Sequence, residues 1–535
     1  MAIHRRVLLC GIALAFGLGA STATAKTFEL QGASIEDIHA AVDAGKLSYE
    51  KLVQLYLARI AAYDKKGPAL NTVITLNAKA IETARALDAE FRVRGRRSSL
   101  HGIPVLAKDN YDTADMPTSG GSFMLAKSLP FEDAPSIRQL RDAGAIILAK
   151  VNMDEFAHGG VGFSSRLGQT RNPHDPKRHP GGSSGGTGAS VAAWFAPLGL
   201  GTDTYGSIRS PSSVNGIVGI KPTNGLISRT GIMPCLLSFD TGGPMARTVY
   251  DVALALGFMT GVDHQDPLTE ASAGLSFRDY TQFLRKDALK GVRLGVIRDH
   301  MGLDAEVDRV FNAAVEELKA QGAVVVDELH YPSVALNSRA DVMQPMQAEL
   351  NEDYAAYLGR LRPGFPKTMA ELASQGAKLT VPEGEFRPHP AMYEIFSKYS
   401  SAPVDSHSLS YIAAREHGMK AVQGAVLGLM QQHSLDALVY STRPIPAEII
   451  NPDIARITER STAPAIRSIA NVAQFPDVIV PAGFTRDRLP VSISFVGPAY
   501  SEPRLLGYAY SYEQATHHRA APATTPSLPG ERFEY

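Results

Sequence analysis

The sequence of 535 residues has only two cysteines and one tryptophan, and neither sign of charge predominates. Cys10 and Cys235 cannot build a scaffold of internal disulfides, and no Cys/His spacing indicates a zinc site. Lys and Arg number 53 against 54 Asp and Glu, so the chain lacks the broad basic face that nucleic-acid binding requires. A chain of this length buries a large core without disulfides or metals. We interpret Cys235 as a buried structural residue rather than a nucleophile.

Long apolar runs are also missing, except near the start of the chain. The run from Val7 to Ala20 carries no charge, follows a basic start and precedes the small residues Ala23 to Ala25. This order is typical of a secretory signal peptide, and the run is shorter than the roughly 20 residues of a transmembrane helix. We therefore expect residues 1–25 to be removed and residues 26–535 to be secreted or periplasmic, without stable membrane insertion. An uncleaved, membrane-tethering anchor is the alternative.

Helix-like and strand-like patterns alternate along the chain. Ser34, with Asp37 as its cap partner, and Ser48 predict the starts of two helices, and Asn77 is expected to cap a third. Further helices are expected over 136–143 and 304–321. Short apolar runs predict buried strands over 103–107, 146–149, 198–200, 293–297, 323–326, 435–440, 478–480 and 491–496.

Because strand-like runs occur from start to end, we expect one α/β domain over residues 26–535. Residues 332–408 have the weakest pattern, and we interpret them as an irregular or helical insertion.

The strongest local signal is a Gly- and Ser-rich stretch between His179 and Thr223. Its first part, Gly181 to Gly188, contains two serines and leads into an apolar helix expected over 189–195, which argues against a flexible linker. A phosphate cradle is the other interpretation of such glycines. The Lys-Ser/Thr ending of a P-loop and the GxGxxG pattern are both absent, so this interpretation is disfavoured.

Ser207 stands on a glycine-rich turn, Gly201 to Arg209, directly after the strand expected at 198–200. Such a turn exposes a nucleophile and can direct backbone N–H groups at a developing oxyanion.

A serine nucleophile needs a base. Lys108 follows an apolar strand, and burial could lower its pKa enough for it to accept a proton. A lysine paired with Asp109 or Asp112 fits the spacing equally well. The histidines in this half of the chain lack a recognisable partner motif and are interpreted as structural or surface residues: His101, His158, His174 and His179.

Together these motifs resemble those of the amidase signature family. The resemblance spans roughly residues 35–529 and is weakest between 332 and 465. It is carried, in chain order, by HGIPVLAKDN, GGSSGG, GTDTYGSIR, GIVGIKPT, FDTGGPMAR and VIVPAGFTRDRLPVSISFVG. The resemblance implies an α/β fold with a large mixed β-sheet surrounded by helices, and a reaction that needs no metal or organic cofactor.

The resemblance also implies roles for individual residues. Ser207 matches the nucleophile, Lys108 the base, and Ser183 a proton relay that follows a cis peptide bond. The backbone N–H groups expected to form the oxyanion hole are those of Thr204, Tyr205, Gly206 and Ser207. The residues expected to orient the site by hydrogen bonds are Ser184, Asp203 and Arg209.

Tyr205 stands where many family members have glycine. Backbone donors survive this change, because every non-proline residue supplies an N–H group. A tyrosine favours ordinary negative φ. We expect its ring to line the entrance or to contact the substrate, and outward packing is the alternative.

The predicted function is hydrolysis of a carboxylic amide, in a small molecule or a peptide, as in secreted bacterial peptide amidases. An aryl-acylamidase or an ester hydrolase with the same triad is the alternative. The signal peptide disfavours the ammonia-transferring component of an amidotransferase complex, and the presence of Lys108, Ser183 and Ser207 together disfavours a non-catalytic binding protein. Substrate specificity is expected in the variable region, residues 291–465, and in the loop at 118–121. The sequence carries no signal for the oligomeric state.

Overall fold

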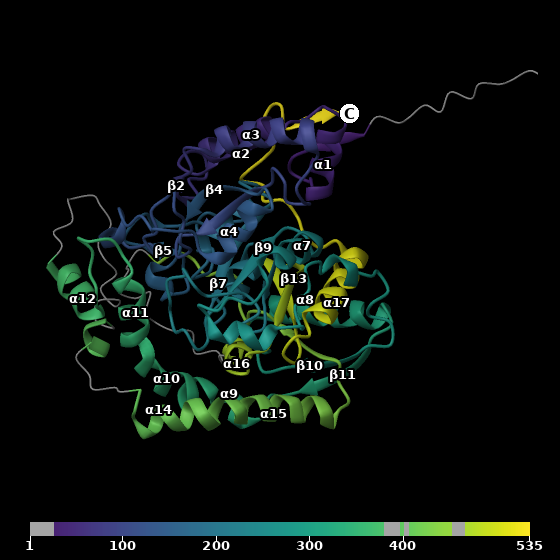
Figure 1. Cartoon of the computed structure of the whole chain (residues 1–535). Coiled ribbons are helices and arrows are strands. Elements are labelled where there is room, and N and C mark those ends of the chain that lie inside the picture. Colours follow the sequence, from purple (N-terminus) through teal and green to yellow (C-terminus); the bar gives the residue numbers. More distant parts are fainter. Residues whose placement is uncertain (1–25, 379–395, 401–405, 452–465) are drawn as a thin grey trace, which may run out of the picture.

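The computed structural model describes residues 26–378, 396–400, 406–451 and 466–535. The predicted signal peptide therefore lies outside the described residues. The centre of the fold is one mixed sheet of 11 strands (Figure 1). Across the sheet the strands are β11 (Val324–Leu329), β10 (Arg293–Ile297), β12 (Ala437–Ser441), β14 (Pro490–Val496), β13 (Asp477–Phe484), β8 (Val218–Lys221), β9 (Thr241–Ala246), β7 (Leu198–Asp203), β3 (Pro104–Lys108), β4 (Ile146–Val151) and β2 (Val73–Leu76).

The sheet is parallel at β11-β10-β12 and at β7-β3-β4, and antiparallel between the remaining neighbours. Every residue of β3, β4, β7, β8 and β9 is buried, which explains their continuous apolar character. The expected α/β fold with a large mixed sheet is confirmed. The prediction that residues 26–535 form one domain stays a prediction.

Helices pack around the sheet, with α7 against β8 and β9, α8 against β13 and β14, and α5 against β7 and β3. The helices of this layer are α1 (Ile35–Asp43), α2 (Tyr49–Tyr63), α3 (Ala80–Arg94), α4 (Pro135–Asp142), α5 (Gly185–Ala192), α6 (Arg209–Val214), α7 (Val249–Met259), α8 (Ala305–Ala320), α16 (Arg467–Val472) and α17 (Glu502–Thr516). Within the described residues, no helix combines the length and the apolar character needed to cross a membrane.

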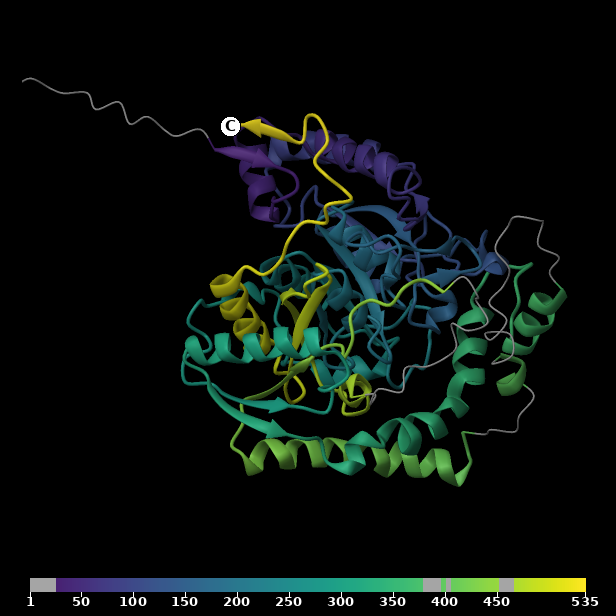
Figure 2. The same cartoon turned by 180° about the vertical axis from the view of Figure 1, so that it is seen from behind.

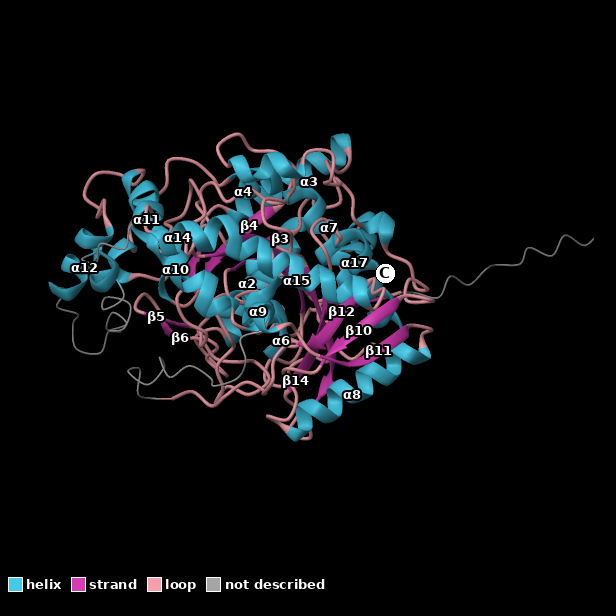
Figure 3. Cartoon of the chain, turned by 90° about the horizontal axis from the view of Figure 1, so that it is seen from below, coloured by secondary structure: helices cyan, strands magenta, loops and turns pink. Residues whose placement is uncertain are grey.

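A row of helices, here called the helical arm, leaves the sheet after β11 and returns at β12 (Figures 1 and 3). Its helices are α9 (Ser333–Leu336), α10 (Gln344–Met346), α11 (Leu350–Gly359), α12 (Met369–Lys378), α14 (Leu409–Ala413) and α15 (Met419–Gln432). The described part of the insertion expected at 332–408 is therefore largely helical. The arm has its own apolar cluster, which includes Met346 and Tyr354 and extends to Phe156 and Leu236 beside the sheet.

Short strands complete the fold. The two ends of the described chain lie side by side, because β1 (Thr27–Glu29) pairs antiparallel with β15 (Arg532–Glu534) (Figure 2). A small hairpin joins β5 (Phe163–Ser164) and β6 (Gly168–Gln169).

Local capping signals are confirmed at two helices and displaced at a third. Ser34 and Asp37 form the capping box of α1, and the Ser48 hydroxyl accepts a hydrogen bond from the Lys51 N–H at the start of α2. At the third helix the expected cap is displaced, because α3 begins at Ala80 and its N-cap position is Lys79. Asn77 lies two residues earlier, where its Oδ1 accepts a hydrogen bond from the Lys79 N–H at 2.9 Å and its amide donates to the Ile147 carbonyl on β4.

The helix expected at 189–195 is displaced toward the glycines. In the structure α5 runs from Gly185 to Ala192, and Trp194 adopts a φ of 59° just beyond its end. The glycines allow this helix to pack closely against neighbouring segments, since a β-carbon at Gly186 would lie 2.3 Å from the Asn152 carbonyl oxygen.

Candidate active site

The fold gathers the predicted site residues at one edge of the sheet. Lys108 and Asp203 are the last residues of β3 and β7, which are parallel neighbours, so both lie at the same end of these strands. Ser183 lies just before α5, and Ser207 lies on the turn between β7 and α6. This turn, residues 203–209, is here called the nucleophile turn.

Lys108 and the two serines form a compact group. Lys108 Nζ lies 2.7 Å from Ser183 Oγ, and both side chains are fully buried. The Ser184 N–H donates to the Ser207 carbonyl at 3.2 Å, which brings the two serine segments together. Ser207 is 5% exposed, and the Gly182–Ser183 peptide bond is cis, as the resemblance implied. No hydrogen bond links the hydroxyls of Ser183 and Ser207, two of the described residues.

The surroundings of Lys108 shift its protonation equilibrium toward the neutral amine. Burial lowers its pKa to about 8, although Asp154 and Asp203 act in the opposite direction. Nζ also lies 2.7 Å from Thr202 Oγ1, a contact that the sequence did not indicate.

The alternative pairing of this lysine with nearby aspartates does not occur. Asp109 instead lies 3.5 Å from Lys150, and Asp112 accepts a hydrogen bond from Tyr357 at 2.7 Å.

Asp154 contacts the segment of Ser183, the predicted relay serine, and was missed in the sequence analysis. Its carboxylate accepts hydrogen bonds from the N–H groups of Val161 and Gly162, and its own N–H donates to the Ser183 carbonyl at 3.1 Å. A β-carbon at Gly182 would lie 1.9 Å from Asp154 Oδ2, so only glycine fits there. Burial raises the pKa of Asp154 to about 6.

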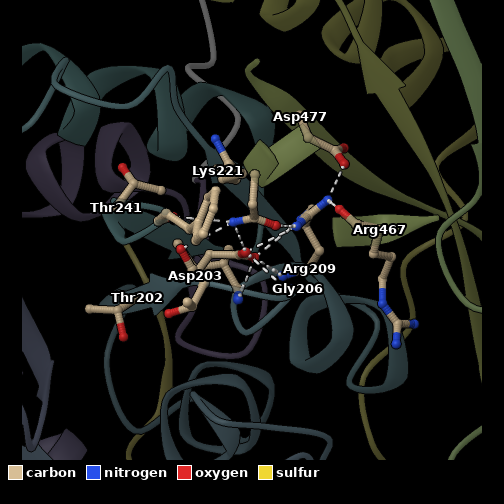
Figure 4. Close-up of polar contacts among 12 residues, drawn as sticks. Thr202, Asp203, Gly206, Arg209, Lys221, Thr241, Arg467 and Asp477 are labelled. Atoms are coloured by element: carbon tan, nitrogen blue, oxygen red, sulfur yellow. Dashed lines mark hydrogen bonds and ion pairs between the residues drawn. The ribbon is translucent and has the colours of Figure 1, made fainter. Parts of the chain in front are cut away.

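Asp203 and Arg209 shape the nucleophile turn (Figure 4). Asp203 accepts hydrogen bonds from the N–H groups of Gly206 and Ile208 at 2.8 and 2.9 Å, and Arg209 Nη2 lies 3.0 Å from its Oδ1. Burial alone would raise the pKa of Asp203, but the Arg209 guanidinium holds it well below its usual range. Arg209 also contacts Asp477 at 2.9 Å, and Ser184 Oγ donates to the Thr202 carbonyl at 3.2 Å.

The four expected oxyanion donors are not equivalent. The Gly206 N–H is engaged by Asp203. Within the part of the chain that the structure describes, the N–H groups of Thr204, Tyr205 and Ser207 donate to no other residue. Three of the four N–H groups therefore have no partner among the described residues, and Asp203 holds the fourth in place.

The Tyr205 ring faces the interior of the protein. It is half-buried, packs against the cluster of Met153, Ala157 and Cys235, and lies below the Arg339 guanidinium at 5.8 Å. The ring thus fills the space between the nucleophile turn and the helical arm.

Among the described residues the one free thiol, Cys235, lies beside Tyr205 rather than in the group of Lys108, Ser183 and Ser207, and the four histidines also stand outside that group. Cys235 is 2% exposed, and burial raises the pKa of its thiol. Three of the histidines contact backbone carbonyls: His101 that of Leu87, His158 that of Phe156 and His174 that of Asn215. His179 contacts the Glu448 carboxylate.

Known proteins resemble this chain over most of its length. The profile of the Amidase family matches residues 51–506. The crystal structure of native peptide amidase from Stenotrophomonas maltophilia superposes with a TM-score of 0.82 at 36% identity, covering 92% of this chain and 99% of that one. A glutamyl-tRNA(Gln) amidotransferase component from Halorhodospira halophila is 35% identical over 91% of this chain and 98% of its own. A probable amidase from Arabidopsis thaliana is 31% identical over 96% of both chains.

The α/β fold with this mixed sheet and the similarity to these relatives identify the chain as an amide-hydrolysing enzyme. More narrowly, the chain belongs to the amidase signature family.

Proposed function

We propose that the enzyme hydrolyses a carboxylic amide through an acyl-enzyme on Ser207, with Ser183 as proton relay and Lys108 as base. The observation that carries this proposal is the 2.7 Å contact between Lys108 Nζ and Ser183 Oγ, beside the segment that carries Ser207. A lysine can act as a base only when neutral, and the lowered pKa of Lys108 supports that role.

The first half of the reaction forms the acyl-enzyme. Ser207 Oγ attacks the amide carbonyl carbon while its proton passes through Ser183 Oγ to Lys108 Nζ. The carbonyl oxygen becomes an oxyanion opposite the N–H groups of Thr204, Tyr205 and Ser207, each of which stabilises it by about 3 kcal/mol. The C–N bond then breaks, and the proton returns through Ser183 to the leaving nitrogen.

The second half releases the acid. A water molecule attacks the ester carbonyl, gives its proton to Lys108 through Ser183, and the C–O bond to Ser207 breaks. Ser207 recovers a proton from Lys108 by the same route, so the triad ends in its starting state. An aryl amide or an ester would pass through the same steps, which leaves both as alternative substrates.

The likeness to a peptide amidase supports a small-molecule or peptide amide as substrate, and the predicted export signal disfavours ammonia transfer within a complex. We also propose that residues 1–25 are a cleaved export signal. N-terminal sequencing of the protein recovered outside the cytoplasm, with Lys26 as the first residue, would support this.

The proposed function is tested with purified protein on primary amides, C-terminally amidated peptides, aryl amides and esters. Release of ammonia, amine or alcohol is compared between the wild type and Ser207→Ala. We expect the variant to lose at least about 1,000-fold in kcat/KM, because the nucleophile is removed.

Ser276→Ala is the matched control, since Ser276 is half-buried between α7 and β10 and lies outside the site. Labelling by a fluorophosphonate should modify Ser207 and nothing else. Equal turnover by the wild type and Ser207→Ala, or labelling that survives in the variant, would contradict the proposal.

A further inference from the structure

Arg467 lies directly against the nucleophile turn and has no part in the steps above. It is the first residue of α16, and a β-carbon at Gly206 would lie 3.0 Å from its Nε and 3.2 Å from its Cδ. Gly206 immediately precedes Ser207. In Figure 4 the Arg467 side chain extends away from the Asp203–Arg209 pair, while its main-chain carbonyl accepts a hydrogen bond from Arg209.

The charge of Arg467 has no carboxylate partner among the described residues. Its Nη1 donates to the Thr442 carbonyl at 3.3 Å, and its Nε is buried without a hydrogen-bond partner. Buried charges in proteins are ordinarily paired. The neighbouring buried arginines follow that rule, since Arg209 binds Asp203 and Arg443 binds Glu448.

A second guanidinium, that of Arg443, acts on Arg467, although Glu448 pairs with Arg443. Arg443 is 8% exposed, and its Nη1 donates at 2.9 Å to Ser210 Oγ, in the first turn of α6. Burial and the charges of Arg443 and Arg209 together lower the pKa of Arg467 to about 10, so Arg467 stays charged at neutral pH.

We propose that Arg467, with Arg443 behind it, binds a carboxylate of the substrate, so that the preferred substrate is an amide that also bears a carboxylate group. Nη1 is held by Thr442 and Nε is buried against Gly206, which leaves Nη2 as the donor for the ligand. A single charge-assisted hydrogen bond from Nη2 suits a carboxylate oxygen, and the half-buried side chain has an exposed side from which a ligand can reach it. The inference rests on the proposed role of Ser207, because Ser207 places the scissile amide beside Arg467.

The test compares substrates that differ only in charge. Half-amides of short dicarboxylic acids are paired with alkyl amides of the same chain length, and kcat/KM is measured for both. We expect the wild type to prefer the half-amide by about tenfold or more, mainly through KM, as a charged hydrogen-bonded contact gives. Arg467→Met should lose this preference, so that its kcat/KM values for the half-amide and the alkyl amide become similar, and Arg467→Lys should retain part of it.

Arg504→Met is the control, since Arg504 is an exposed arginine on α17. It should leave the preference unchanged. Thermal unfolding of each variant verifies that it is folded.

A second measurement needs no substrate. The short monocarboxylate butyrate should slow fluorophosphonate labelling of Ser207 in the wild type but not in Arg467→Met. Labelling that butyrate does not slow, or a charge preference that persists in Arg467→Met, overturns the carboxylate site and leaves the proposed function standing. Absence of labelling in folded wild type overturns the proposed nucleophile itself, and with it this inference.

Discussion

Lys108 illustrates how burial can give a common side chain an uncommon property. Its ammonium group would be charged in water at neutral pH, yet its complete burial lowers the pKa to about 8. About a tenth of the molecules would then hold a neutral amine at pH 7. Its hydrogen bonds to Ser183 and Thr202 fix Nζ at the relay serine.

The proposed role of Lys108 predicts the pH dependence of the reaction. Because the base works in its neutral form, kcat/KM should rise about tenfold per pH unit below pH 8 and level off above it. Initial rates over a pH range, on one amide of fixed charge, measure this rising part of the pH profile, here called the acidic limb. A limb centred near pH 6 or 7 would point to a different base.

A substitution of Asp154 should change the midpoint of the acidic limb. Its carboxylate raises the pKa of Lys108, so Asp154→Asn should shift the midpoint to lower pH as well as reduce the rate. Asp287→Asn changes an exposed carboxylate and serves as control. If Asp154 only supports the backbone around Gly182, the rate will fall and the midpoint will not move.

At the scale of elements, the helical arm and the nucleophile turn meet through Tyr205 and a loop at 235–238. The loop N–H groups of Leu237 and Ser238 donate to Asp353 and Glu349, which belong to α11 and the turn before it. The arm is thereby attached beside the site, which places part of the variable region where it can influence specificity.

Tyr205 is the residue through which this contact should affect substrate choice. Tyr205→Gly keeps the backbone donor and removes the ring, so we expect the ratio of kcat/KM for bulky and small amides to rise about tenfold, with activity retained. Tyr205→Phe keeps the ring and should leave the ratio unchanged. Kinetics on a size series of amides decides, and an unaltered ratio in Tyr205→Gly would show that the ring does not line the substrate site.

The features that could be predicted from the sequence are those that depend on contacts between residues close together in the chain. Ser34 and Ser48 bind N–H groups three residues away, so their caps could be predicted from local sequence. Asn77 also accepts a local N–H, that of Lys79, but its amide is held by Ile147 on another strand, and no local pattern carries that second contact. Ser183, Ser207 and Lys108 were found from motifs, whereas Thr202, Asp154 and Arg467 emerged only when distant segments came together.

At the scale of the whole molecule, Arg209 joins separate parts of the sheet. Its guanidinium contacts Asp203 at the end of β7, Asp477 at the start of β13 and Asn471 in α16. All of these side chains are fully buried. One cation therefore neutralises two carboxylates from distant segments and fixes the nucleophile turn against the C-terminal half of the chain.

Arg209→Met should cost the protein about 3–5 kcal/mol of unfolding free energy at neutral pH, because it leaves buried carboxylates without their cation. The pKa of Asp203 is lowered in the folded state, so its interaction with Arg209 contributes stability above the pKa of an unfolded aspartate. That contribution is lost as the pH falls through the folded value. In Arg209→Met, burial acts unopposed and raises the pKa of Asp203, so its carboxyl takes up a proton as the pH falls to 4 and part of the penalty disappears. The difference between wild type and variant should therefore be larger at pH 7 than at pH 4. Urea unfolding at both pH values measures it, with Arg504→Met as control, and an equal loss at both would mean that packing rather than charge holds the two parts together.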